Sequence, residues 1–164
     1  MFRLILVLLI FVSSSVTISA QKSVEGEEKV YPTVFQIGDK PEAFEELSED
    51  YETGLLDVCE DDVKKAHQQW TLMLKSMEKH AKTNGFEING VKMWVKVFWK
   101  KDGSIKHIAF HLKPTSKNVD RKALQQFLKS FAKSYSSEIK ASKDYSQYSS
   151  ASFPTLPQLV FDKE

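Results

Sequence analysis

The sequence predicts an α+β protein in which a small antiparallel sheet packs against a long N-terminal helix and a second helix. Two observations carry this prediction. Residues 55–83 and 119–135 place apolar side chains at three- and four-residue steps, which is typical of helices with one buried face. Between them, two strand-like runs (about 91–100 and 104–113) flank the turn-forming pair Asp102-Gly103, which predicts a β-hairpin.

The N-terminus has the pattern of a secretory signal. Met1–Arg3 is weakly basic, an apolar run covers Leu4–Val12, and small Ala20 stands at the expected cleavage position. The run is shorter than the roughly 20 residues that a spanning helix takes. We therefore expect residues 1–20 to be cleaved, which gives a periplasmic or secreted protein without a stable membrane span. An uncleaved anchor that extends through the following Ser and Thr residues is the alternative.

Two segments are expected after the signal. Residues 21–50 form an acidic, partly flexible lead, in which "VFQIGD" resembles a short strand and "KPEAFEELSEDY" begins like a helix, with Pro41 in its first turn. Residues 51–164 form a single α+β domain around one core. Cys59 is the only cysteine, so no internal disulfide is possible. Its place on the helical apolar stripe favours a small buried hydrophobe over a reactive thiol.

Charge is unevenly distributed although the net charge is +1. Residues 21–62 hold fourteen acids and three lysines, whereas residues 86–143 hold thirteen Lys or Arg and four acids. This asymmetry marks either a surface for a charged partner or two parts of one fold that attract each other. The second is favoured because the basic residues are spread through strands and a helix. Nucleic acid is not an expected partner of an exported chain.

The helix at 55–83 has one continuous apolar stripe, and its Met and Trp residues are expected in the core. Glu60–Asp62 either begin a new helix or form the exposed side of this one. The helical pattern is expected to end at Asn84-Gly85. The stripe consists of Leu56, Cys59, Val63, Ala66, Trp70, Met73, Met77 and Ala81.

The C-terminal third begins with the second helix, which Asn118 or Asp120 would cap. Residues 134–152 are rich in Ser and predict a loop or irregular arm. "SFPTLPQLVF" could be a last strand, which its two prolines confine to an edge.

A two-residue turn at Asp102-Gly103 would fix the pairing of the hairpin. The core face then pairs Val97 with Ile108, Val95 with Phe110, and Met93 with Leu112. The outer face pairs Trp94 with His111, Lys96 with Ala109, and Phe98 with His107, because side chains alternate along a strand. A longer loop could shift this register by one residue.

The outer face of the hairpin is the candidate binding site. Aromatic residues are enriched in protein interfaces, so an exposed strip of this kind would contact a protein or peptide. Alternatively, another element such as the 55–83 helix covers it, and both sheet faces are buried. The candidate contact residues are Trp94, Phe98, His107 and His111, with Lys92 and Lys96 as charges at the rim.

The sequence predicts neither a catalytic nor a metal-binding site. His107 and His111 share a strand face but lie roughly 13 Å apart, too far to share one ion. His67 and His80 have no further ligand at a suitable spacing, so no zinc site is predicted. Cys59 has no nucleophile signature, and neither G-x-S-x-G nor a phosphate-binding glycine loop occurs. We therefore expect a non-catalytic protein without a cofactor or metal.

Between Gly90 and Leu124, apolar residues, one Asp-Gly turn and the start of a helix follow a pattern of strand, turn, strand and helix. Its positions are Met93, Val95, Val97, Trp99, Asp102-Gly103, Ile105, Ile108, Phe110, Val119-Asp120 and Ala123-Leu124. With this pattern, residues 90–124, approximately, resemble the C-terminal domain of TonB-type energy transducers. The chain has no Pro-rich spacer, and its long helix at 55–83 is an elaboration. The resemblance implies a periplasmic binding module that recruits an extended peptide by strand addition.

The sequence thus favours an exported, non-catalytic binding module for an envelope protein or an extended peptide. One alternative is a structural or accessory envelope protein in which both sheet faces are buried. The other is a small ligand carrier or hydrolase that uses a pocket between helix and sheet.

Overall fold

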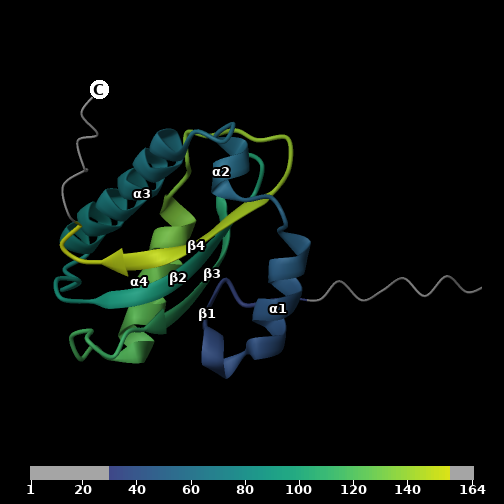
Figure 1. The fold of residues 1–164 in the computed structure, drawn as a ribbon. Coiled ribbons are helices and arrows are strands. Elements are labelled where there is room, and N and C mark those ends of the chain that lie inside the picture. Colours follow the sequence, from purple (N-terminus) through teal and green to yellow (C-terminus); the bar gives the residue numbers. More distant parts are fainter. Residues whose placement is uncertain (1–29, 156–164) are drawn as a thin grey trace, which may run out of the picture.

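The structure is a computed structural model, and it describes residues 30–155. The expected signal (1–20), the start of the lead (21–29) and residues 156–164 lie outside the described residues; 156–161 belong to the expected last strand. The α+β class is confirmed (Figure 1). The elements are β1 (Val34–Gln36), the 3₁₀ turn η1 (Ile37–Asp39), α1 (Pro41–Asp50), α2 (Leu55–Val58), α3 (Val63–Thr83), β2 (Lys92–Trp99), β3 (Ile105–Leu112), α4 (Arg121–Ser134) and β4 (Tyr145–Ser152).

The four strands form one sheet in the order β1-β3-β2-β4. β2 is antiparallel to both β3 and β4, whereas β1 is parallel to β3. The sheet is therefore mixed, and the expectation of a purely antiparallel sheet is wrong. Parallel pairing needs a long crossover between the two strands. Residues 37–104, with three helices and β2, supply that crossover.

The predicted register of the hairpin is confirmed from Met93↔Leu112 to Phe98↔His107. The prediction of a two-residue turn is wrong, because the strands are joined by a longer loop. Within this loop, the Gly103 N–H donates to the Lys100 carbonyl (2.8 Å). Gly103 has φ +84°, the left-handed region that glycine adopts without a steric cost. The register shifts next to Phe98, where Trp99 pairs with Ile105. This bulge compensates for the longer loop and preserves the pairing of the rest of the hairpin.

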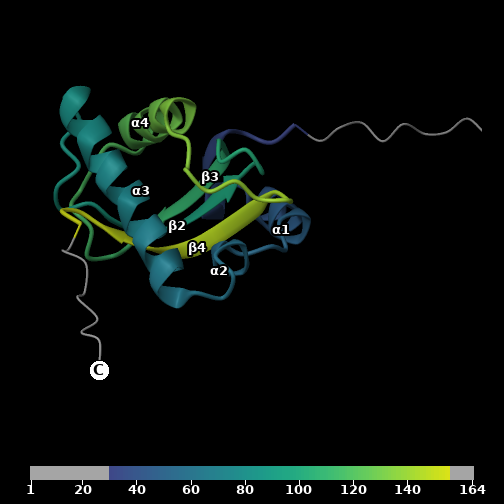
Figure 2. The same cartoon turned by 90° about the horizontal axis from the view of Figure 1, so that it is seen from above.

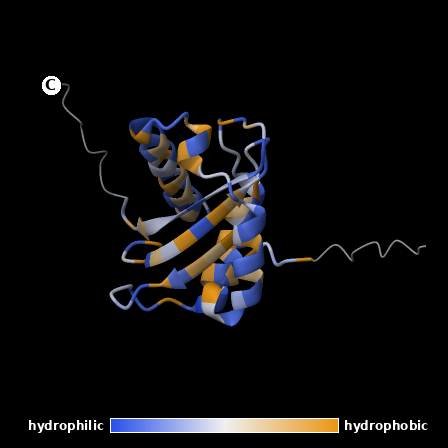
Figure 3. Ribbon diagram, turned by 45° about the vertical axis from the view of Figure 1, so that its right-hand side comes forward, coloured by the Kyte–Doolittle hydropathy of each residue, from blue (hydrophilic) through white to orange (hydrophobic). Residues whose placement is uncertain are grey.

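Helices cover both faces of the sheet. Figure 2 shows α1 separated from α3 and α4 by the strands. α3 and α4 pack on the face that carries Met93, Val95 and Val97, all 0% exposed, and form the main core. α1 packs on the opposite face through Leu47 and forms a second, smaller core. The two central strands are rich in hydrophobic residues (Figure 3), as expected for strands with a covered surface on each side.

The predicted 55–83 helix is two helices, α2 and α3. Glu60 and Asp61 have φ values of 61° and 60°, which end α2 and redirect the chain. The Asp62 carboxylate then accepts a hydrogen bond from the Lys65 N–H (2.9 Å) and caps α3, so a new helix begins here. Val63, expected on the apolar stripe, is consequently 67% exposed. The end of α3 is as predicted, since Gly85 has φ +64°.

The prediction of an irregular arm over residues 134–152 holds for 135–144 and is wrong for 145–152. Residues 145–152 form β4, which pairs with β2 along its whole length, from Trp99↔Tyr145 to Lys92↔Ser152. Residues 34–50 of the predicted lead also take part in the fold as β1, η1 and α1. Within residues 30–155, none of the helices combines the length and hydropathy needed to cross a bilayer.

Candidate functional site

The outer face of the hairpin is divided into a covered half and an exposed half. α1 covers the half near the turn, where Phe98 and Ala109 are 0% exposed. The ring of Tyr51 meets that of Phe98 edge to face at 5.1 Å. The covering helix is therefore α1, whereas the 55–83 segment suggested by the sequence lies on the opposite face.

His107 belongs to the covered half. Its Nδ1–H donates to the Pro32 carbonyl (2.9 Å), and Tyr31 packs edge-on against its ring. Burial lowers the pKa of the imidazole, and the nearby Lys106 and Lys100 charges lower it further. Phe98 and His107, both predicted contact residues, are thus unavailable to a partner in this structure.

The exposed half centres on Trp94, whose side chain is 42% exposed. Tyr148 of β4 lies beside it, with ring centroids 6.1 Å apart, and is 49% exposed. Phe44 of α1 meets the other side of Tyr148 at 6.1 Å. His111 is also exposed on this face. Three rings from three elements thus form a row across the sheet, which we call the aromatic row: Phe44, Tyr148 and Trp94.

Lysines flank the aromatic row. The Lys113 ammonium lies 4.0 Å from the centroid of the Trp94 ring and donates to the hydroxyl of Ser150 in β4 (2.6 Å). The Lys96 ammonium lies 5.5 Å from the Phe44 ring, and burial lowers its pKa. Lys92, predicted at the rim, is half-buried at the start of β2.

Four of the predicted contact residues thus remain on or beside the aromatic row: Trp94, His111, Lys92 and Lys96. Sequence reasoning missed Tyr148, Ser150 and Lys113. The first two belong to β4, which has too many serines to show a strand pattern. The signal that could have found them is the pair of tyrosines Tyr145 and Tyr148, because aromatic residues favour strands.

The structure also shows where the other chemically capable residues lie. Cys59 is 0% exposed, and burial raises the pKa of its thiol. Over residues 30–155, no three His, Cys, Asp or Glu side chains gather as ligands for a metal ion. One cleft, of about 350 Å³, lies between α3 and α4 and is lined by Ser76, Lys79, His80, Thr83, Phe131, Ser134, Tyr135 and Ser136.

The chain matches no family model, no curated protein and no solved structure. The function is therefore inferred from the positions and contacts of the residues of this chain.

Proposed function

We propose that this chain is an exported, non-catalytic module that binds an extended segment of an envelope protein or peptide by adding it as a strand to β4. The observation that carries the proposal is the position of the aromatic row, exposed beside an edge strand of eight residues. Strand addition gives affinity through main-chain hydrogen bonds, while neighbouring side chains select the sequence.

The outer edge of β4 is occupied at two points and has open backbone donors between them. The Ser150 carbonyl accepts a hydrogen bond from Trp70 Nε1–H (3.4 Å), and Ser146 is bridged to Gly54. Ser146 N–H points away from β2, since it donates to the Thr53 carbonyl (2.9 Å). Because backbone groups alternate along a strand, Tyr148 and Ser150 also direct their N–H groups outward. No acceptor for these two N–H groups is found in the part of the chain that the structure describes. An incoming strand would supply the acceptors.

The opposite edge of the sheet is less suited to this role. β1 has three residues, and the Gln125 side chain of α4 donates to its Val34 carbonyl (2.7 Å). Such side-chain caps are one way in which proteins block an edge. β4 carries one cap of this kind as well, from Trp70 to the Ser150 carbonyl (3.4 Å), but its eight residues leave a longer edge than the three of β1. β4 is therefore the edge on which we place the partner.

The side chains beside this edge favour a partner with apolar and acidic residues. Trp94 and Tyr148 offer flat apolar surfaces, and Lys113 and Lys96 offer positive charge next to them. The resemblance to TonB C-terminal domains implies the same mode of binding and a periplasmic or secreted location, and both remain part of this proposal.

Substitution of Ser150 tests the proposal. Peptides selected from a random display library on the purified protein would be measured by fluorescence anisotropy against three proteins: the wild type, Ser150→Pro and Ser150→Ala. Proline removes an N–H group only from the open edge, whereas alanine keeps it. Both variants lose the hydrogen bond with Lys113, so they are matched in that respect.

We expect Ser150→Pro to weaken peptide binding at least about tenfold, and Ser150→Ala to bind within about twofold of the wild type. Equal binding by all three proteins would show that the β4 edge is not used. Failure to select any peptide would favour the second candidate, a structural or accessory protein. The observation behind that candidate is the burial of Phe98, His107 and Ala109 under α1.

A further inference from the structure

We propose a second binding site, independent of the aromatic row and of β4: the cleft between α3 and α4 binds a sulfate or phosphate ester group of an anionic polysaccharide. Its ligand would extend over the basic outer surface of the two helices.

The helices α3 and α4 carry a large excess of basic residues. All of these except Lys65, which is paired with Glu60 (3.7 Å), are exposed. The two helices carry nine Lys or Arg residues and one acid, Glu78. The Glu78 carboxylate accepts a hydrogen bond from the Thr155 N–H, so it is turned toward the end of the described chain. A surface with this excess of positive charge raises the local concentration of anions. The cations are Lys64, Lys65, Lys75, Lys79, Lys82, Arg121, Lys122, Lys129 and Lys133.

The cleft between the helices combines one cation with several hydroxyl groups. Lys79 supplies a positive charge that pairs with an oxyanion, and five further lining residues carry hydroxyl groups. The hydroxyls of Thr83, Ser134 and Ser136 already donate to backbone carbonyls, so their oxygens are acceptors for sugar hydroxyls. Phe131 forms an apolar part of the lining. The hydroxyl residues are Ser76, Thr83, Ser134, Tyr135 and Ser136.

His80 is held at this cleft by contacts from α4. Its Nε2 lies 3.0 Å from the Ser130 hydroxyl and its Nδ1 3.4 Å from the Ser134 hydroxyl. Its ring also packs against Phe127 and Phe131, with centroids 5.7 and 5.8 Å away. The imidazole and its two serines are thus fixed before any ligand arrives, which lowers the entropy cost of binding.

A polysaccharide fits these features better than a membrane surface. Its ester groups pair with the lysines, and its sugar hydroxyls pair with the Ser, Thr and Tyr side chains of a concave site. A membrane-binding surface relies on apolar side chains that enter the lipid. Among residues 30–155, α4 has no large hydrophobic residue that is exposed, and α3 has two, Val63 and Leu72.

The test compares two double variants that lose the same charge. Lys75→Gln/Lys79→Gln removes one cation from the cleft and one from the preceding turn of α3. Lys40→Gln/Lys117→Gln removes two exposed cations that lie outside both helices. The probes are a heparin octasaccharide, a phosphorylated mannan oligosaccharide and vesicles with 20% phosphatidylserine, titrated at 150 mM salt. Thermal denaturation verifies that both variants are folded.

We expect saturable binding of at least one oligosaccharide. Its affinity should fall on the order of tenfold in Lys75→Gln/Lys79→Gln and stay within about twofold in the control. In NMR titrations, the amide signals of Ser134, Tyr135 and Ser136 should move. The two oligosaccharides distinguish a sulfate from a phosphate source.

Three results would overturn the inference: no saturable oligosaccharide binding, equal losses in the two variants, or tighter binding of the vesicles than of either oligosaccharide. None of them bears on the peptide-binding proposal, because both variants leave β4 and the aromatic row unchanged.

Discussion

The division of the outer sheet face can be tested by comparing Phe98→Ala with Trp94→Ala. Phe98 is 0% exposed, and its ring meets those of Tyr51 at 5.1 Å and His107 at 6.3 Å. Removal of a buried Phe side chain costs about 3–5 kcal/mol, and each aromatic contact contributes about 0.5–1.5 kcal/mol. We therefore expect Phe98→Ala to lower the free energy of unfolding by about 4 kcal/mol.

Trp94→Ala should cost much less, since this side chain is 42% exposed. The main losses are its partly buried area and its contact with the Lys113 ammonium, together about 1.5 kcal/mol. With a urea m-value of about 2 kcal/mol/M, the midpoint should fall by about 2 M for Phe98→Ala and by less than about 1 M for Trp94→Ala.

The assay is urea denaturation followed by far-UV circular dichroism, which does not depend on the deleted tryptophan. An unchanged m-value would show that both variants unfold from the same native state. A loss below about 1 kcal/mol for Phe98→Ala would refute the burial of Phe98 under α1. Equal losses for the two variants would refute the division of the face.

Three further predictions follow from single residues. Gly103→Ala should lower the melting temperature markedly, because at φ +84° the added Cβ would lie 2.4 Å from the Ser137 carbonyl oxygen. The unfolding free energy should fall as the pH is lowered from 7 to 5. Burial keeps the pKa of His107 below 6.5 in the folded state, so the unfolded chain binds more protons in this range; a similar pH dependence in His107→Gln would contradict this. Cys59 should react with Ellman's reagent only after unfolding, since it is 0% exposed; rapid reaction of the native protein would contradict its burial.

The hairpin could be predicted because its two strands alternate cleanly around one strong turn signal. That pattern gave the correct pairs from Met93↔Leu112 to Phe98↔His107. The longer loop and its bulge could not be predicted, since two compensating local changes leave the apolar pattern unaltered. The register of a strand pair is therefore better determined by sequence than the shape of its turn.

β4 and the role of α1 could not be predicted for a different reason. Both depend on contacts with distant parts of the chain. Tyr145–Ser152 is a strand because β2 offers it a complete backbone partner, not because its side chains alternate. The sequence predicted residues 21–50 as an acidic, partly flexible lead, yet Leu47 packs α1 onto the sheet. Because α1 covers only part of this face, Phe98 is buried while Trp94 is exposed.

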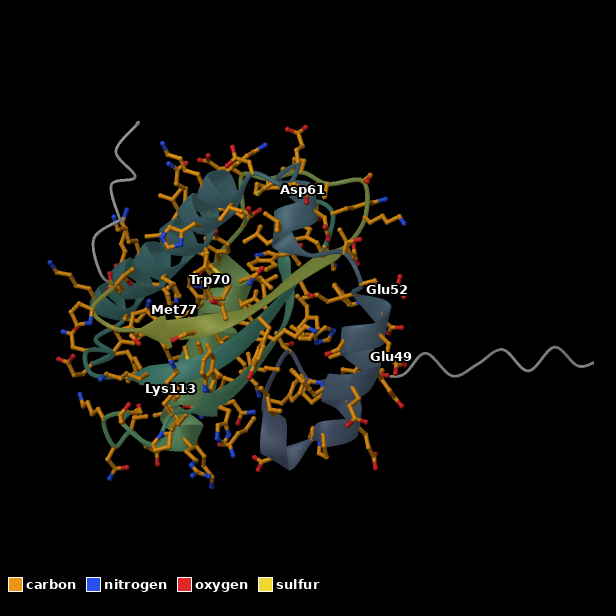
Figure 4. The ribbon with its side chains drawn as sticks, in the orientation of Figure 1. Glu49, Glu52, Asp61, Trp70, Met77 and Lys113 are labelled. Carbon is orange, nitrogen blue, oxygen red and sulfur yellow. The ribbon has the colours of Figure 1, made fainter. Side chains whose placement is uncertain are left out.

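The charge asymmetry of the sequence acquires a different meaning in the structure. α1 carries five acids and no cation, and it lies across the sheet from the basic helices α3 and α4. Figure 4 shows Glu49 and Glu52 on the α1 side, whereas Trp70 and Met77 lie between α3 and the sheet.

Two packed layers, each about 10 Å deep, separate these charges. That is more than twice the Debye length of about 8 Å at physiological salt. Attraction between the two sets of exposed charges is therefore largely screened and contributes little to the fold. The acids of α1 and the cations of α3 and α4 therefore form two separate surfaces of opposite charge. Moderate salt should leave the stability nearly unchanged while it weakens the proposed polysaccharide binding. A large loss of stability between 50 and 500 mM salt would restore the view that the two charged parts of the chain hold each other in place.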